Sequence, residues 1–338
     1  MKKILVVTEA NECVASGHLF ECLETCNYLT SKNIECILLV NSDMQDGLKR
    51  RININYYEYS KNIQNESEFL ISFLREHRID TVMFNLRDIK NEFVQLLKQK
   101  IDVCIISVDE FGNKTLDADV IVNPMIDSSF WKYDTKGKVY CGEQYLVLPL
   151  KLQEYHNRDK DIRDQIKMIT VSMGGVDVGN STIKLAKWLK DDQSIDILNL
   201  VLGGGYRQEE ELREVVRDAK NVKIYRNIDF LSELFFESDL AFCSGGNTLH
   251  ELAVIGTPTI VIPSVPHEVK NGKAYEEKGF SYCASIANDF NYDEFLQVCK
   301  KIKPYSIRED MSIAGKSQVD GKGYERIYDI LCANDNSL

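Results

Sequence analysis

The 338-residue chain has a formal charge of −11, with 44% hydrophobic and 28% charged residues, which is ordinary globular composition and suits two domains of roughly 150 residues each. The acidic balance argues against nucleic-acid binding, because a nucleic-acid binder needs a basic face. No apolar run approaches the roughly 18 residues that span a bilayer, and the one after Met1 ends too early for an export signal.

Short β-branched runs alternate with amphipathic stretches in the first half of the chain. We expect strands in KILVVT, IECILLV, TVMFN, VCIISV and ADVIVNP, and helices over residues 17–31, 65–77 and 91–99. This alternation is typical of a parallel sheet with crossover helices on both faces. Strands that are apolar throughout indicate a sheet that is buried on both sides.

The second half repeats this alternation. Strands are expected in MITVSMGG, ILNLVLGGG, NVKIYRN, LAFCSGG, TIVIPSV and SYCASI, and helices over about 181–190, 208–219, 229–237, 248–255, 269–278 and 292–302. The charged stretch 151–167 lacks a strand, so we interpret it as a link between α/β domains at residues 1–150 and 168–316. A last helix, over roughly 317–333 of the segment 317–338, is expected to pack back on the first domain.

The ten cysteines form no CxxC motif, and several lie in strand-like runs. In a chain without an export signal we expect them to be reduced core residues, which favours the cytoplasm. Two DxD patterns, at 117–119 and 159–161, match the short metal motif of sugar transferases, but charge runs usually mark a solvated surface. We therefore expect neither a bound metal nor another cofactor.

The turns that follow strands carry the functional information, because open parallel sheets bind ligands beyond the carboxyl ends of their strands. The first such turn places Gly17 and His18 at the start of a helix. The positive end of a helix disfavours the protonated imidazole, and a neutral histidine suits a general base. The alternative is that His18 caps the helix or packs under it.

A glycine turn follows the first strand of the second half. Gly174 and Gly175 leave backbone amides open to a ligand. Asp177, two residues further on, suits either a helix cap or a ligand contact. Position alone leaves both alternatives open.

A second glycine turn comes before the helix that contains Glu251. The turn and the helix start consist of Ser244, Gly245, Gly246, Asn247 and Thr248. Helix amides at such a turn suit a phosphate or pyrophosphate. Thr248 and Glu251 match a capping box, in which the carboxylate folds back on the helix start. Alternatively, Glu251 accepts hydrogen bonds from ribose hydroxyls, as acidic residues do in dinucleotide folds.

Five stretches resemble, in order, motifs of the UDP-sugar hydrolases of the pseudaminic acid pathway and of their spore-coat polysaccharide relatives. They are ASGHLFECLETCNYLTSKNIE, ISVDEFGNKTLDADVIVNP, CGEQYLVLPLKLQEY, VSMGGVDVGNSTIKLA and CSGGNTLHELAVIGTPTIVI. That family is built like the peptidoglycan N-acetylglucosaminyltransferases, with two Rossmann-like doubly wound domains facing across a cleft. The resemblance implies an α/β fold of the GT-B type.

The resemblance also implies a metal-independent enzyme that acts on a UDP-activated, N-acetylated sugar. Glu251 would contact the ribose, the turn at 244–248 would hold the pyrophosphate, and its amides would stabilise the departing UDP. His18 matches the histidine of the family's GxGH motif and would deprotonate the nucleophile. Further contacts would come from Gly174 and Gly175 on the nucleotide side, and from Gly17, Asp177, His267, Glu268 and Asn271 on the sugar side.

Four departures from the family pattern fall mainly on the sugar side. Ala15 replaces the first glycine of GxGH, and Glu21 replaces the arginine of an RC pair. Asn85, in FNLRD, stands where a DxY element is usual. His267-Glu268 replaces an NQ pair, while Asn271 in the same stretch matches the transferase pattern.

The nucleophile decides the reaction. Water would make the protein an inverting hydrolase that releases UDP and a free N-acetylated (deoxy)sugar, in surface-glycan or nonulosonic acid biosynthesis. An acceptor hydroxyl would make it an inverting glycosyltransferase. Loss of the arginine and of the DxY element would also fit a nucleotide-sugar-binding or partner protein without catalysis. We expect hydrolysis, because the ordered resemblance is closest to the hydrolases.

Overall fold

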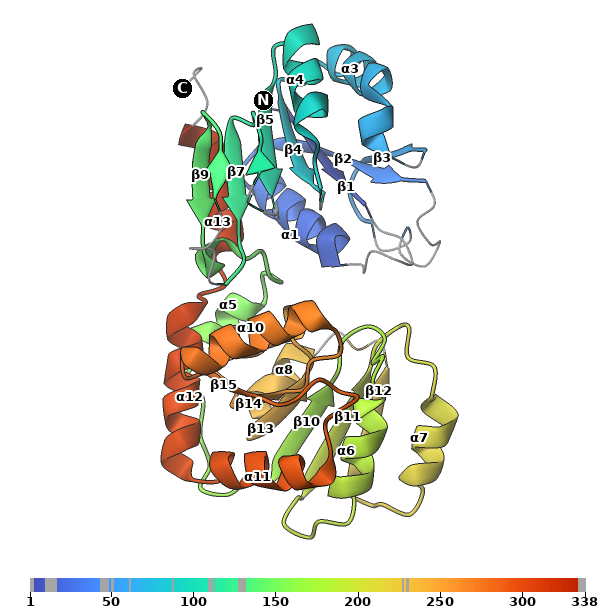
Figure 1. Ribbon diagram of the computed structural model, residues 1–338, viewed down its shortest axis with the longest axis vertical. Coiled ribbons are helices and arrows are strands. Elements are labelled where there is room, and N and C mark those ends of the chain that lie inside the picture. The colour runs from blue at the N-terminus through green and yellow to red at the C-terminus, as the bar shows by residue number, and fades with distance from the viewer. Residues whose placement is uncertain are drawn as a thin grey trace. The chain divides into compact units, whose positions relative to one another are not determined.

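The computed structural model describes residues 3–9, 17–42, 49, 52–60, 62–86, 88–108, 112, 114–126, 132–226, 228 and 231–333. The chain divides into two compact units (Figure 1). Unit 1 consists of residues 1–149 and 322–338, and unit 2 of residues 150–321. Each unit is built on one parallel sheet with helices on both faces.

The sheet of unit 1 has seven strands in the order β3-β2-β1-β4-β5-β7-β9, all paired in parallel. The strands are β1 (Lys3–Thr8), β2 (Glu35–Asn41), β3 (Tyr56–Tyr59), β4 (Thr81–Asn85), β5 (Cys104–Val108), β7 (Val120–Asn123) and β9 (Lys138–Cys141). A separate pair joins β6 (Lys114–Thr115) to β8 (Tyr133–Asp134). We did not expect β9, a short edge strand whose side chains are half-buried or exposed and therefore give no apolar run.

Helices cover both faces of this sheet (Figure 1). They are α1 (Gly17–Ser31), α3 (Ser67–Glu76), α4 (Asn91–Lys100) and α13 (Gly323–Ala333), with the 3-10 turns η1 (Ile63–Asn65) and η3 (Glu143–Tyr145). One core layer contains residues of α1 and α13 with Ile4 and Val6 of β1. The other contains residues of α3 and α4 with Leu5 and Val7. Alternate β1 side chains thus enter opposite layers, which explains why the strand is apolar throughout.

Helix α13 closes unit 1 from the end of the chain. The rings of Tyr324 and Tyr28, on α13 and α1, have centroids 4.6 Å apart. A Cβ at Gly323 would lie 2.1 Å from the carbonyl oxygen of Leu146, so the backbone approach here requires glycine. The helix expected over 317–333 begins later than predicted, at Gly323. Residues 317 and 318 are instead the end of a separate helix, α12 (Tyr305–Gln318), and Gly321, at φ +70°, lies between the two helices.

The sheet of unit 2 has six parallel strands in the order β12-β11-β10-β13-β14-β15. They are β10 (Met168–Ser172), β11 (Ile197–Leu202), β12 (Val222–Arg226), β13 (Leu240–Cys243), β14 (Thr259–Val261) and β15 (Ser281–Cys283). The helices are α5 (Leu152–His156), α6 (Ser181–Leu189), α7 (Glu209–Val215), α8 (Leu231–Glu237), α9 (Asn247–Ile255), α10 (Pro266–Glu277), α11 (Tyr292–Ile302) and α12.

The charged stretch 151–167 is more than a link, because it is part of unit 2 and includes α5. The Nζ of Lys160 donates to the carbonyl oxygen of Ser238 at 2.9 Å, beyond the end of α8. The fully buried guanidinium of Arg308, on α12, donates to the carbonyl oxygens of Arg163 and Asp164 at 2.7 and 2.8 Å. Long-range contacts of this kind leave no signal in the local sequence.

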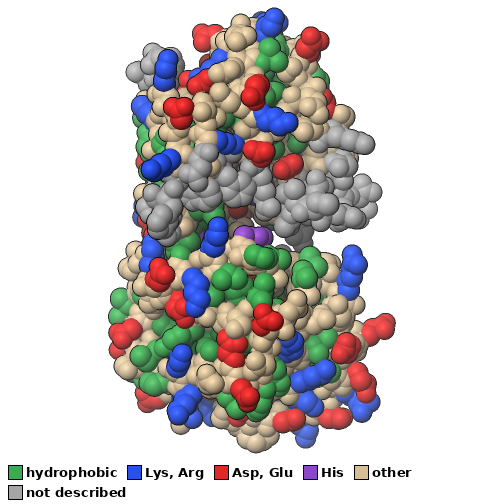
Figure 2. All heavy atoms as spheres, viewed as in Figure 1, with side chains coloured by type: hydrophobic (Ala, Val, Ile, Leu, Met, Phe, Trp, Pro, Cys, Tyr) green, Lys and Arg blue, Asp and Glu red, His purple; other side chains and the backbone are tan. Residues whose placement is uncertain are grey.

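Charge is dispersed over the surface. On the face seen in Figure 2, the described acidic and basic side chains are interspersed on both units, so the net charge does not gather there in one patch. Among the helices that the structure describes, none has the length and apolar character needed to cross a membrane.

Arg308→Met should destabilise unit 2 by about 2 kcal/mol or more, because two charge-assisted hydrogen bonds to buried backbone carbonyls are lost. Calorimetry should show a lower unfolding temperature, and hydrogen exchange should accelerate at residues 158–167. Arg213→Met is the matched control, since its guanidinium makes an exposed i,i+4 ion pair with Glu209 worth at most about 1 kcal/mol. Equal effects of the two substitutions would contradict an anchoring role for Arg308.

Candidate functional site

The turns after β10, β11 and β13 meet at the carboxyl edge of the unit 2 sheet. A Cβ at Gly203, after β11, would lie 2.2 Å from the carbonyl oxygen of Gly174, after β10. Gly174 itself has φ +76°, which favours glycine. The hydroxyl of Ser244, after β13, lies 3.4 Å from the position of a Cβ on Gly174. The structure thus brings together two of the turns predicted from the sequence, and adds Gly203, which the sequence analysis did not assign.

Helix α10 holds the turn after β13 in place. A Cβ at Gly245 would lie 2.4 Å from the carbonyl oxygen of Glu268. The Nδ2 of Asn271 donates to the carbonyl oxygen of Gly245 at 2.8 Å. Glu268 and Asn271, predicted as substrate contacts, therefore lie beside the glycine turn, and Asn271 fixes its backbone. His267 is exposed on the first turn of the same helix.

Gly246 is the residue before α9, and glycine has no side chain that could cap the helix. Its carbonyl oxygen accepts the amide of Leu249 at 2.9 Å, so the helix starts at Asn247. Backbone amides at the start of a helix are suited to bind an anion.

Glu251 lies in the first part of α9 with a half-buried side chain. The capping-box alternative is not seen, because Gly246 rather than Thr248 precedes the helix, and within the described residues no hydrogen bond reaches the Glu251 carboxylate. Burial raises the pKa of this carboxyl to about 7. The Glu251 carboxyl can therefore accept hydrogen bonds from a bound ligand.

Glu268 places a second carboxylate next to the same turn. Its Oε2 accepts the amide of Ser264 at 2.7 Å, which holds the loop between β14 and α10. Its Oε1 lies 3.5 Å from the position of a Cβ on Gly246. An anion bound at the start of α9 would therefore have a negative side chain nearby, which weakens anion binding through Coulomb repulsion.

Asp177 acts as a helix cap in this structure. Its two carboxylate oxygens accept the amides of Ser181 and Thr182, both at 2.9 Å, at the start of α6. The residue is buried, with φ +47°. Of the two alternatives that the sequence left open, the cap is observed, and direct contact with a substrate stays a prediction.

In unit 1, His18 lies in the first turn of α1, directly after Gly17, and is 5% exposed. Glu21 follows one turn later, and its Oε2 accepts a hydrogen bond from the Nδ2 of Asn85 at 3.2 Å. Asn85 ends β4, so this contact joins α1 to the carboxyl edge of the sheet. Glu21 and Asn85, two of the departures from the family pattern, therefore bind each other. A third departure, Ala15, lies outside the described residues.

Two buried polar atoms at this edge have no partner among the described residues. They are Oγ1 of Thr8, which ends β1, and Oδ1 of Asn85. An unsatisfied buried polar group typically costs about 1–3 kcal/mol, so each such atom requires an explanation. Thr8 was missed in the sequence analysis, although a polar residue that ends the buried run KILVVT is a signal that could have found it.

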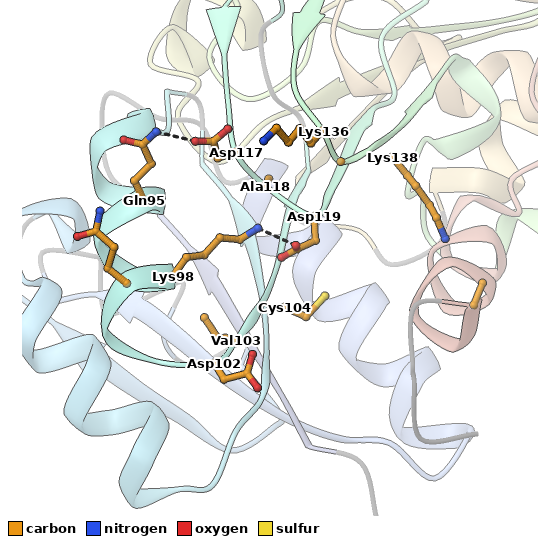
Figure 3. A pocket seen from close by; sticks show the side chains of 13 residues that line it. Gln95, Lys98, Asp102, Val103, Cys104, Asp117, Ala118, Asp119, Lys136 and Lys138 are labelled. Carbon is orange, nitrogen blue, oxygen red and sulfur yellow. Dashed lines mark hydrogen bonds and ion pairs between the residues drawn. The ribbon is translucent and has the colours of Figure 1, made fainter.

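A pocket lies elsewhere, at the other edge of the unit 1 sheet. A pocket of about 910 Å³ opens at the amino ends of β5, β7 and β9, the opposite edge of the unit 1 sheet (Figure 3). Two of its acidic residues bind neighbouring side chains, since Asp117 accepts from Gln95 and Asp119 pairs with Lys98, both at 2.6 Å. These two carboxylates belong to the first DxD pattern, and each of them binds a side chain of α4.

Metal and disulfide chemistry find no further support in the described part of the chain. No group of three or more His, Cys, Asp or Glu side chains there is arranged to hold a metal ion. The nine described cysteines are all thiols.

The chain is similar to known proteins in sequence and in fold. Residues 168–290 match the glycosyltransferase family 28 C-terminal domain. The spore coat polysaccharide biosynthesis protein SpsG of Bacillus subtilis is 24% identical over 79% of this chain and 80% of its own length. The crystal structure of Acinetobacter baumannii MurG superposes with a TM-score of 0.72 at 15% identity, covering 98% of this chain and all of that one. The resemblance indicated by the motifs is confirmed. The chain is related to the SpsG-like proteins and has the GT-B fold.

Two further relatives match this chain over different shares of their own length. A UDP-2,4-diacetamido-2,4,6-trideoxy-beta-L-altropyranose hydrolase of Campylobacter jejuni is 19% identical over 82% of this chain and 97% of its own. The uncharacterized protein MJ1062 of Methanocaldococcus jannaschii is 26% identical over 77% of this chain. The match spans 55% of that archaeal protein, about half of its length.

Stability should depend on pH through Glu251. The pKa of Glu251 is about 7 in the folded protein and 4.5 in the unfolded chain. Between these pH values the folded state binds more protons than the unfolded state. The contribution of Glu251 to stability therefore falls as the pH rises from about 4.5 to 7. Glu251→Gln should therefore raise the unfolding temperature relative to the wild type more at pH 8 than at pH 5.

Glu277→Gln, which changes an exposed carboxylate of α10, is the control and should show no such difference between the two pH values. A Glu251→Gln variant that follows the wild type at both would show that burial of this carboxyl has little effect on stability.

Proposed function

We propose that this protein is an enzyme of the glycosyltransferase or nucleotide-sugar hydrolase class that acts on a UDP-sugar in surface-polysaccharide biosynthesis. Within that class we infer an inverting hydrolase, which releases UDP and a free N-acetylated (deoxy)sugar. The named relatives support the class, since one is a spore coat polysaccharide biosynthesis protein and another a UDP-sugar hydrolase. The choice of hydrolysis within this class rests on the order of the sequence motifs, which is closest to that of the hydrolases.

The observation that carries the nucleotide half of the proposal is a glycine turn at a helix start, with the carboxylate of Glu251 in the same helix. The turn at Gly245 and Gly246 leads into α9, whose first amides would bind the pyrophosphate. Glu251, without a hydrogen-bond partner among the described residues, would accept hydrogen bonds from the two ribose hydroxyls. Both features lie within the part of the chain that matches the family 28 domain.

The chemical step uses a base and a stabilised leaving group. His18 deprotonates a water molecule that attacks the anomeric carbon on the face opposite to UDP. The anomeric C–O bond breaks, and its electron pair leaves on the β-phosphate oxygen. The α9 amides stabilise the negative charge that develops there, which is the role that a divalent cation has in other enzymes. His18 suits this role because it lies in the first turn of α1, beyond the strand ends, and is nearly buried.

The direct test of the reaction is UDP release from UDP-N-acetylated sugars without an acceptor or a metal. Turnover under these conditions supports hydrolysis. Turnover that requires an added acceptor hydroxyl would instead identify a transferase. Binding without turnover in either assay would contradict both reactions.

His18→Ala should lower kcat for UDP release by about a hundredfold or more, because general bases typically contribute this much. The affinity for UDP, measured by calorimetry, should stay unchanged. His77→Ala is the control, since His77 follows α3 and stacks on Phe73 away from the strand ends. Turnover of His18→Ala within about threefold of the wild type would exclude His18 as the base.

Glu268→Gln should raise the affinity for UDP about threefold at low salt, because it removes a negative charge beside the proposed phosphate site. The glutamine oxygen can still accept the Ser264 amide. Glu294→Gln is a matched control, since Glu294 accepts the backbone amide of Ser285 at 2.8 Å from α11. If UDP binds less tightly to Glu268→Gln than to the wild type, the pyrophosphate does not lie beside this side chain.

A further inference from the structure

The carboxyl ends of β1 and β4 present two side chains to the same face of the sheet. Thr8 and Asn85 are the last residues of these strands and stand opposite each other in the parallel register. Ile4 and Val6 of β1 and Met83 of β4 belong to the core layer on the α1 face. Since side chains alternate along a strand, Thr8 and Asn85 also face α1.

Both side chains are almost fully buried and carry an oxygen that is unused. Thr8 is 0% and Asn85 3% exposed, and neither Oγ1 of Thr8 nor Oδ1 of Asn85 has a hydrogen-bond partner among the described residues. The amide of Asn85 cannot turn to hide its oxygen, because its Nδ2 donates to Glu21. Buried oxygens that stay unpaired are unfavourable, so this pair is suited to a small O–H group that is present when the site is in use.

The proposed base lies on the same helix as the residue that orients Asn85. His18 and Glu21 are three residues apart on α1, which makes them neighbours on one face of the helix. Tyr59 adds rigidity, because its hydroxyl donates to the carbonyl oxygen of Thr8 at 3.1 Å and holds the end of β1. The two unused oxygens are therefore fixed in place close to the start of α1.

We propose that Thr8 and Asn85 orient the water molecule that His18 deprotonates. This inference rests on the proposed hydrolysis. A water nucleophile has two hydrogens, of which one goes to a ring nitrogen of His18 and the other is held by Oδ1 of Asn85. The hydroxyl of Thr8 donates to one lone pair of the water, which leaves the second lone pair to attack the anomeric carbon.

The step balances without a further reactant. The water oxygen forms a bond to the anomeric carbon, the bond from that carbon to UDP breaks, and UDP takes the electron pair. His18 accepts the proton of the water and later releases it to solvent. Thr8 and Asn85 exchange no proton, so they act as positioning residues.

The test compares two substitutions of Thr8 that affect stability and positioning in opposite ways. Thr8→Val keeps the shape and removes the hydroxyl, so it should leave the unfolding temperature unchanged or raise it, while kcat falls between about ten- and a hundredfold. Thr8→Ser keeps the hydroxyl and loses a methyl group, so it should lower the unfolding temperature and keep kcat within about threefold of the wild type.

Thr81→Val is the matched control for the strand environment. Thr81 starts β4 at the opposite edge of the sheet, and its hydroxyl bonds to Asp80 at 3.0 Å. This substitution should leave kcat and KM for the UDP-sugar unchanged. Asn85→Leu should lower kcat as Thr8→Val does, and UDP affinity should be unaffected in all of these variants.

The kinetic pattern separates water from a sugar hydroxyl as the group that is bound. A lower kcat with an unchanged KM supports the positioning of water. A higher KM with an unchanged kcat would mean that the oxygens contact the sugar, which overturns the proposal, as would full activity of Thr8→Val. If the wild type itself releases no UDP without an acceptor, hydrolysis fails and this proposal fails with it, whereas an active wild type with unaffected variants overturns this proposal alone.

Discussion

Close backbone approach at the carboxyl edge of the unit 2 sheet is the constraint on which the candidate nucleotide site depends. Gly203 and Gly174 touch at a distance that a side chain would not allow, and Gly245 lies against the backbone of Glu268 in the same way. Glycine at these positions lets three strand-to-helix turns converge. Gly246 comes before α9 without a side chain that could cap it, and two carboxylates belong to this region, Glu251 within the helix and Glu268 beside the turn.

These two acids have different surroundings, and this difference suggests different uses. The carboxylate of Glu268 already accepts a hydrogen bond from the backbone amide of Ser264. Glu251 has no such commitment among the described residues, and burial raises its pKa. A ligand that brings hydroxyl donors to Glu251 would replace the hydrogen bonds that the protein itself does not supply. A phosphate would interact with the helix amides against the repulsion of Glu268, which would tune affinity rather than abolish it.

Unit 1 contributes a different kind of chemistry. Its strand ends hold neutral oxygens instead of glycine turns, and the contact between Glu21 and Asn85 joins them to the helix that begins with His18. Glu21 and Asn85, two residues that depart from the motifs the sequence resembles, bind each other in this structure. A substitution of Glu21 alone would remove the hydrogen bond that the Nδ2 of the buried Asn85 donates, and an unsatisfied buried amide is costly.

The sequence by itself determined the alternation of strands and helices, the parallel sheets and the positions of the glycine turns, because these depend on local periodicity and on residues that tolerate unusual backbone geometry. It also placed His18 at a helix start and Glu251 one turn into a helix. Only the tertiary structure decided that Asp177 caps α6, that no capping box holds Glu251, and that the charged stretch 151–167 is anchored by Arg308. Thr8 and Asn85 became neighbours in the same way, through the pairing of β1 with β4. The Arg308 anchor and the pairing of Thr8 with Asn85 join elements far apart in the chain, so they depend on packing and not on spacing along it. The Asp177 cap is local, but the same spacing also allowed a ligand contact, and only the folded turn shows that the carboxylate binds the α6 amides.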